Sequence, residues 1–181
     1  MTREFEIDVR WVAFPLHPEI PPEGLTLEKL FEGRGIDVPA VLSRLESAAR
    51  SFGLPFGTRR MSFNSRRAQE GAKWAEAQGK ADAYHLAVFQ AYFVDGRNLH
   101  EMDTLVRAAE SVGLEAAGLT EAIRTRAYKV AVDEDWMLSH RLGITAVPTF
   151  RLNGELLVGA QPYEALAAFA AAHGIPRRTL A

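Results

Sequence analysis

The sequence predicts an α/β fold that carries an all-helical insertion, and three observations support this prediction. Residues 5–14 alternate apolar and charged side chains with a period of two, which is typical of a half-buried strand. Residues 66–118 place apolar side chains at helical spacing throughout. An Asn-Gly pair at 153–154 separates two short β-rich runs, which is the strongest local signal for a β-hairpin.

The N-terminal third predicts one strand, a rigid connection and two helices. The strand is expected at 5–14, and the connection at 15–24 contains four prolines, which remove backbone donors and favour extended chain. Helices are predicted at 25–31 and 38–52, because apolar residues recur at helical spacing and Gly53 follows the second. A loop with a short strand then leads to Asn64 or Ser65, either of which can cap the next helix.

The remaining elements are helices, apart from the hairpin. Three helices are expected, each followed by a glycine or by Asp-Gly, at 66–78, 83–94 and 102–112. A longer helix is predicted from about Thr120 to Leu142, where Gly143 ends it. The hairpin strands are predicted at 148–152 and 155–159. Pro162 is expected as the first residue of a last helix that Gly174 closes.

Composition is that of a soluble globular protein and excludes some classes of function. The 181 residues are 48% hydrophobic and 24% charged, with 21 basic and 23 acidic side chains and a net charge of −2. No overall field therefore attracts nucleic acid or anionic lipid, and neither partner is expected. No apolar run approaches the roughly 20 residues of a membrane span. Charges occupy the start of the chain where a secretory leader would be apolar, so a cytoplasmic location is the default expectation.

The chain contains no cysteine, which is the firmest constraint in the composition. It excludes disulfides, thiolate nucleophiles and cysteine-bound zinc within these residues. The five histidines show no metal-binding spacing, and no P-loop or dinucleotide-binding motif is present. We therefore expect no catalytic residue, no metal and no resident cofactor from the residues themselves.

Pro148 stands at the start of a predicted strand, where a proline that lacks an N–H can be accommodated. One hypothesis is a cis Val147–Pro148 peptide bond that exposes the backbone N–H and C=O of Val147 to a ligand. The alternative is a turn with a structural role only.

Four stretches together resemble the DsbA-like branch of the thioredoxin superfamily; they are 10–24, 63–99, 138–150 and 153–166. The chain is most similar to FrnE-type thiol oxidoreductases, and more distantly to 2-hydroxychromene-2-carboxylate isomerases and kappa-class glutathione transferases. The resemblance implies a thioredoxin-like domain at 1–62 and 119–176 that is interrupted by a helical subdomain at 63–118.

One departure from the family pattern concerns the redox site. The family begins with a strand, a Cys-x-x-Cys turn (a serine in the isomerases) and a helix, but only four residues precede Phe5 here. We therefore expect this βα unit, and the redox pair that it carries, to be missing from the chain. The strands at 5–14 and 148–152 would then pair directly or leave a gap. Because unpaired strand edges favour pairing with another chain, a homodimer or larger homo-oligomer is predicted.

The resemblance also implies where a ligand binds. The backbone of Val147, before the cis Pro148, pairs with a bound substrate or with glutathione in such proteins. Gly159, Ala160 and Gln161 lead into the last helix, and this region holds the γ-glutamyl end in the glutathione-using relatives. An ordinary helix start is the alternative for these three residues, although the N-terminus of a helix does favour an anion.

Asn64 is the remaining candidate, at the entry to the helical insertion. This position faces the cleft in the relatives, and the alternative is an N-cap, for which asparagine is a preferred residue.

Three functions remain open from the sequence. The resemblance implies a thiol-disulfide oxidoreductase that is redox-inactive as written, because exchange requires an attacking thiolate. A glutathione-dependent isomerase or transferase is the second, since its thiol comes from the ligand. The third is a non-catalytic binding or chaperone-like module that holds a protein or thiol-containing client.

Overall fold

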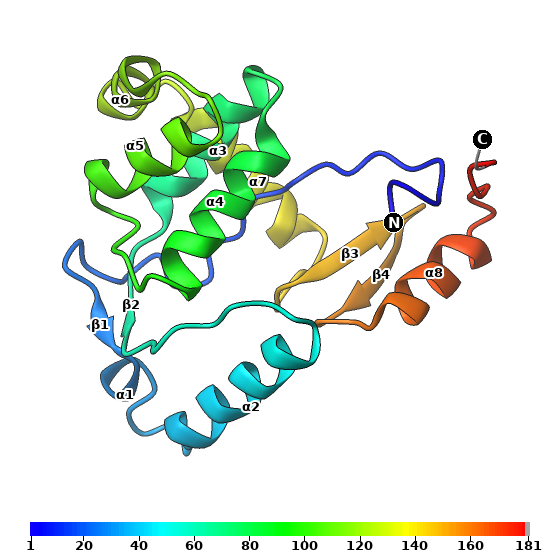
Figure 1. The fold of residues 1–181 in the computed structure, drawn as a ribbon, viewed down its shortest axis with the longest axis horizontal. Coiled ribbons are helices and arrows are strands. Elements are labelled where there is room, and N and C mark those ends of the chain that lie inside the picture. Colours follow the sequence, from blue (N-terminus) through cyan, green and yellow to red (C-terminus); the bar gives the residue numbers. More distant parts are fainter. Residues whose placement is uncertain (180–181) are drawn as a thin grey trace. The chain divides into compact units, whose positions relative to one another are not determined.

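The computed structural model describes residues 1–179, and the chain in it divides into two compact units (Figure 1). We call His17–Asp133 the helical unit. Met1–Leu16 together with the described residues from Glu134 onward form the hairpin unit. Domain boundaries were predicted after residues 62 and 118. The two compact units divide instead after Leu16 and after Asp133, and the domain boundaries stay a prediction.

The chain is mostly helical and contains two small antiparallel sheets. In the helical unit the elements are β1 (Leu25–Thr26), α1 (Leu27–Leu30), α2 (Val38–Ser51), β2 (Met61–Ser62), α3 (Arg66–Ala77), α4 (Ala81–Phe93), α5 (Met102–Ser111) and α6 (Ala116–Arg124). Helix α7 (Lys129–Arg141) begins in the helical unit and ends in the hairpin unit, which also contains β3 (Thr149–Leu152), β4 (Glu155–Val158) and α8 (Tyr163–Ala172). Strand β1 pairs with β2, and β3 pairs with β4.

The core of the helical unit lies among α3, α4, α5 and α6, which pack on one another (Figure 1). Its cluster of buried residues has fourteen members, and Trp74 and Tyr84 are the largest of them. Helix α5 shows why the helices of this core could be predicted from the sequence. Its apolar residues recur on one face, which is buried here, and the helix ends two residues before Gly113.

The phenol oxygen of Tyr84 lies inside this core, and no described residue forms a hydrogen bond with it. Burial raises the pKa of Tyr84. The oxygen fits only because residue 71 is glycine, since a Cβ there would lie 2.6 Å from it. An unpaired buried hydroxyl carries a desolvation cost.

Changing Tyr84 to phenylalanine is therefore expected to raise the free energy of unfolding by about 1 kcal/mol, measured by urea denaturation. Tyr92→Phe is the matched control. Its hydroxyl accepts a hydrogen bond from Arg59 at 2.6 Å and donates one to Ser62 at 3.3 Å, so that variant should lose stability. A loss of equal size in both variants would contradict an unpaired Tyr84 hydroxyl.

The prediction of a strand at 5–14 was wrong. Within it only Phe5 forms a bridge, with Arg177, and Val9, Trp11 and Val12 are exposed. Alternation marks which side chains share a face, but a strand also needs a neighbour for its backbone hydrogen bonds. No strand among the described residues pairs with 6–14. The N–H of Glu6 donates to the carbonyl of Pro176 at 2.9 Å, and the N–H of Ala13 donates to the Asp135 carboxylate at 2.9 Å.

The single long helix predicted from 120 to 142 was also wrong, because a turn separates α6 from α7. Arg126 adopts a φ of 56°, in the left-handed region that side chains rarely occupy. This backbone directs its guanidinium to Glu70 of α3, which accepts hydrogen bonds at 2.6 and 2.8 Å. Predicted helix 25–31 was too long as well, since Leu25–Thr26 form β1 and α1 covers Leu27–Leu30.

The predicted hairpin is confirmed in the hairpin unit. Asn153 and Gly154 both have positive φ, 48° and 95°, as a two-residue type I′ turn requires. Helix α8 follows, with Pro162 as its N-cap rather than its first residue. Phe5, Ala167 and Ala170 form the small buried cluster of this unit. No continuous four-stranded sheet forms within residues 1–179, and the predicted homo-oligomer stays a prediction.

Candidate functional site

The turn before β3 has the geometry that the sequence predicted. The Val147–Pro148 peptide bond is cis. Two hydrogen bonds hold the turn: the Thr149 hydroxyl donates to the carbonyl of Ala146 at 2.7 Å, and the N–H of Gly159 donates to the carbonyl of Pro148 at 2.8 Å. The second bond fixes the end of β4 against the start of β3.

Val147 is exposed in this turn, with 42% of its surface accessible, and its neighbours Ala146 and Pro148 are exposed too. No hydrogen bond among the described residues uses its backbone N–H or C=O. A donor and an acceptor on one exposed residue match the backbone of a second, extended chain. The turn can therefore add an extended peptide segment by backbone hydrogen bonds.

The hairpin that supports the turn exposes apolar side chains on both faces. The register places Thr149 opposite Val158 and Arg151 opposite Leu156, so these side chains share one face. Phe150 lies opposite Leu157 on the other face. The exposed large apolar residues at this end of the unit are Val147, Phe150, Leu156, Val158 and Tyr163.

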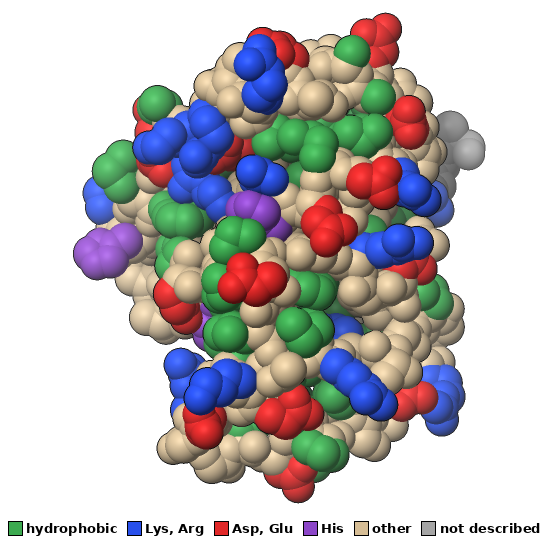
Figure 2. Space-filling view, turned by 90° about the vertical axis from the view of Figure 1, so that its left-hand side faces the viewer, with side chains coloured by type: hydrophobic (Ala, Val, Ile, Leu, Met, Phe, Trp, Pro, Cys, Tyr) green, Lys and Arg blue, Asp and Glu red, His purple; other side chains and the backbone are tan. Residues whose placement is uncertain are grey.

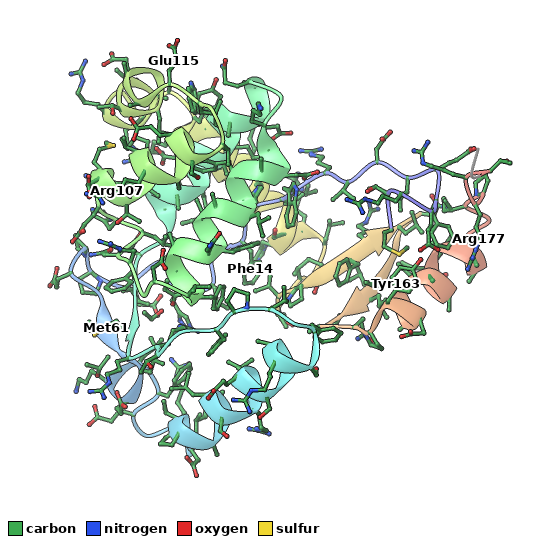
Figure 3. All side chains as sticks on the ribbon, viewed as in Figure 1. Phe14, Met61, Arg107, Glu115, Tyr163 and Arg177 are labelled. Atoms are coloured by element: carbon green, nitrogen blue, oxygen red, sulfur yellow. The ribbon has the colours of Figure 1, made fainter. Side chains whose placement is uncertain are left out.

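Gly159, Ala160 and Gln161 connect β4 to α8, as predicted. Gly159 has a φ of 90°, which favours glycine, and the Gln161 amide donates to the carbonyl of Val158 at 2.7 Å. Tyr163 stands at the start of α8 (Figure 3), where a hydrogen bond with Glu4 raises the pKa of its phenol. The structure thus brings Gly159 to Pro148, and the two residues after it follow as the entry to α8.

Asn64 lies in the helical unit, and its side chain forms three hydrogen bonds there. Its amide nitrogen donates to the carbonyls of Pro18 at 3.2 Å and Ile20 at 2.8 Å, and its amide oxygen accepts the N–H of Arg66 at 3.0 Å. These bonds use both ends of the amide, and they join the proline-rich connection to the start of α3. The N-cap of α3 is Ser65, so Asn64 lies one residue before the cap, and its role in a binding site stays a prediction.

A buried charge cluster in the helical unit was not predicted from the sequence. Glu70 is 1% exposed and binds two arginines, Arg66 at 2.7 Å and Arg126 at 2.6 Å. Arg66 also contacts Asp133 at 2.7 Å and the carbonyl of Lys129 at 2.9 Å. The spacing of Arg66 and Glu70 on one helix was the only local signal, whereas Arg126 is 56 positions away. The cluster joins α3 to α7, so its role is structural.

Other kinds of site find no support in the described residues. Within residues 1–179 no group of histidine, aspartate and glutamate side chains is placed to hold a metal ion. None of the helices described there is long and apolar enough to cross a membrane. Figure 2 shows acidic and basic side chains interspersed on the face that it draws, in agreement with the net charge of −2.

A two-strand hairpin with a cis-proline turn before it and a helix after it is an arrangement of the thioredoxin-like class of proteins. A family model described as a DSBA-like thioredoxin domain matches residues 1–171, so the chain belongs to that family, as the sequence predicted. The fold is accordingly the DsbA-like thioredoxin fold in a mostly helical α/β chain.

Individual relatives agree with this assignment. A solved structure described as a probable DsbA oxidoreductase from Streptomyces coelicolor is 26% identical, with a TM-score of 0.82, and the match covers 94% of this chain and 76% of that one. The structure of a 2-hydroxychromene-2-carboxylate isomerase is 23% identical, with a TM-score of 0.63, over 76% of this chain and 66% of that one, and is a likeness of fold alone.

Among curated proteins, the uncharacterised protein YwbO of Bacillus subtilis is 36% identical over 94 residues. That match covers 50% of this chain and 46% of YwbO, so the chain spans about half the length of this relative.

Proposed function

We propose that this chain binds an extended segment of a protein client at the cis-proline turn, without exchanging disulfides itself. The observation that carries the proposal is Val147, whose exposed backbone N–H and C=O form no hydrogen bond among the described residues. A client that adds as a strand gains affinity from backbone hydrogen bonds, which do not depend on its sequence. Family membership supports the same site, because the family includes oxidoreductases that act on proteins.

The exposed apolar side chains of the hairpin favour a polypeptide over a small polar ligand. Phe150 and Val158 present apolar surface on opposite faces beside the turn. Exposed apolar surface of this kind marks a site for another apolar partner. An unfolded client offers such side chains next to its backbone.

The lack of cysteine separates this proposal from disulfide exchange. Exchange begins when a thiolate attacks a disulfide sulfur, and these 181 residues contain no thiol. Reduction of insulin by dithiothreitol should therefore proceed at the blank rate in the presence of the chain. A clear acceleration would contradict the proposal.

Val147→Asp tests the turn directly. We expect it to weaken binding of a reduced, unfolded client by about tenfold, because its carboxylate competes for the local N–H groups and removes an apolar contact. Binding is measured by fluorescence anisotropy of the labelled client. Val130→Asp on α7 is the matched control, since Val130 is exposed too, at 66%, and it should change affinity less than twofold. An equal loss in both variants would remove the turn as the site.

Glutathione is the competing ligand in this experiment. The N-terminus of α8 after Gln161 offers backbone N–H groups that favour a carboxylate. Calorimetry with millimolar glutathione distinguishes the two ligands. If the wild-type protein binds no client but gives binding heat with glutathione, and Val147→Asp abolishes this heat, a glutathione-dependent function is favoured instead.

A further inference from the structure

A row of aromatic rings lies along α4 in the helical unit. His85, Phe89 and Phe93 follow one another at a spacing of four residues, with ring centroids 6.1 and 6.2 Å apart. Phe56 stacks on Phe93 at 6.3 Å, and Tyr92 contacts Phe93 edge-on at 4.9 Å. We call these five residues the aromatic strip.

Helix α4 is apolar on two sides, and only one of them is used by the core. Tyr84 and Val88 are buried, whereas Leu86 and Phe89 are 67% and 44% exposed. A helix that is apolar all round is normally covered on every side. The exposed side chains of Leu86 and Phe89, next to the half-buried rings of His85 and Phe93, indicate a surface for a binding partner.

Arg59 stands at one end of the aromatic strip. Its guanidinium carbon lies 4.5 Å from the ring centre of Tyr92 and 5.1 Å from that of Phe93, and one N–H donates to the Tyr92 hydroxyl at 2.6 Å. Aromatic faces hold a cation in this way. The contacts fix the position of the guanidinium but use few of its five N–H donors.

No carboxylate among the described residues forms an ion pair with Arg59, and its buried Nε has no hydrogen-bond partner there. This sets it apart from Arg66 and Arg126, which both bind Glu70. Arg59 lies near the C-terminal end of α4, whose carbonyls partly offset its charge. These carbonyls do not form the planar pair of oxygen acceptors that the N–H donors of a guanidinium match best. A carboxylate does.

The geometry of the strip selects an extended peptide. Alternate side chains of an extended chain are about 6.6 Å apart on one face, close to the 6.1 and 6.2 Å between successive rings. Burial lowers the pKa of His85, so that end of the row is neutral at neutral pH. Asp82 and Glu76 act on His85 with negative charge, and Lys73 acts on it with positive charge. Arg59 therefore supplies the charge that selects a partner at the other end.

We propose that the aromatic strip and Arg59 bind an extended peptide segment with apolar side chains at alternate positions and an acidic side chain at the Arg59 end. The acidic group would accept the unused guanidinium N–H donors, and the apolar side chains would lie on Phe93 and Phe89. This surface belongs to the helical unit, so the proposal does not depend on the cis-proline turn.

Two labelled peptides, acetylated and amidated so that neither has a terminal charge, test the proposal by fluorescence anisotropy. Both carry phenylalanine and leucine alternating with serine, and they differ by a glutamate or a glutamine at one end. The wild-type protein should bind the glutamate peptide about tenfold more tightly than the glutamine peptide. Arg59→Gln should bind both with the weaker affinity.

Arg60→Gln is the matched control, because it removes the same charge from the neighbouring exposed residue and should keep the tenfold preference. Phe89→Ser is a second variant that leaves Arg59 in place; it should weaken both peptides equally and keep their ratio. Equal affinity of the wild-type protein for the two peptides, binding of neither, or equal effects of the two arginine changes would each overturn the proposal.

Two further outcomes would reassign the peptide or the surface. Loss of peptide binding in Val147→Asp would place the peptide at the cis-proline turn instead. Self-association in sedimentation velocity that Arg59→Gln abolishes would assign the aromatic strip to a second copy of the chain. Each of these results counts against a peptide partner at Arg59.

Discussion

Replacing Glu70 by alanine is expected to lower the free energy of unfolding by about 3 kcal/mol. Glu70 is 1% exposed and accepts hydrogen bonds from Arg66 and Arg126, which reach it from α3 and from the turn before α7. Removing one partner of a buried ion pair leaves uncompensated charge behind, at a cost of about 3–5 kcal/mol. The side chain of Arg126 is 47% exposed and can regain water, so the lower end of this range applies.

Urea denaturation of Glu70→Ala and of Glu121→Ala provides the comparison. Glu121 forms a similar bond with Arg124 at 2.8 Å, but both side chains are exposed, at 60% and 70%. An exposed pair contributes about 0.5 kcal/mol or less, so this control should remain near the wild-type value. Similar losses in both variants would show that the burial of Glu70 does not matter.

The same cluster should make stability depend on acid. Burial by itself raises the pKa of Glu70, and the hydrogen bonds and charges of Arg126 and Arg66 outweigh it, so the pKa lies below its usual 4.5. A depressed pKa contributes stability above the unfolded value, and this contribution is lost as the pH falls through the folded value. The wild-type protein should therefore lose stability below about pH 4.5 more steeply than Glu70→Gln. Parallel pH curves would contradict the pairing.

Gly57→Ala is expected to lower the free energy of unfolding by about 2–3 kcal/mol. A Cβ at this position would lie 1.9 Å from the carbonyl oxygen of Val94, and this obstacle is backbone, which cannot rotate away. The N–H of Gly57 also donates to the carbonyl of Phe93 at 2.9 Å, a bond that any shift would lengthen. The segment that these contacts hold at the end of α4 continues to Arg59.

Gly79→Ala separates this clash from backbone conformation. Gly79 has a φ of 70° with open space around its Cβ, so alanine there costs about 1 kcal/mol from the left-handed backbone alone. Thermal and urea unfolding should rank Gly57→Ala below Gly79→Ala in stability. The reverse order would show that the chain at Gly57 relaxes freely.

Elements that depend on neighbouring residues could be predicted from the sequence. Helix α2 is Val38–Ser51 against the predicted 38–52, because its periodicity and the following Gly53 are both local. The Asn153-Gly154 turn was predicted for the same reason, since the two residues themselves favour positive φ. The cis bond before Pro148 was predicted by resemblance and is confirmed.

Features that depend on distant partners could not be predicted in this way. The backbone of Arg126 turns where it does because of Glu70, and no local pattern in the sequence encodes that contact. Residues 5–14 alternate as a strand does, but a strand exists only where another strand lies beside it. Arg59 and Arg60 look equivalent in the sequence, and the contacts of Arg59 with Tyr92 and Phe93, more than 30 positions away, distinguish them.

The two units differ in how much apolar surface they bury. The core cluster of the helical unit has fourteen buried residues, whereas Phe5, Ala167 and Ala170 are the cluster of the hairpin unit. Local opening is easiest where few apolar contacts must break, so the hairpin should fluctuate open while α3–α6 remain intact. A client that binds only the closed hairpin then lowers the population of open states, so the client itself would help to order the site that receives it.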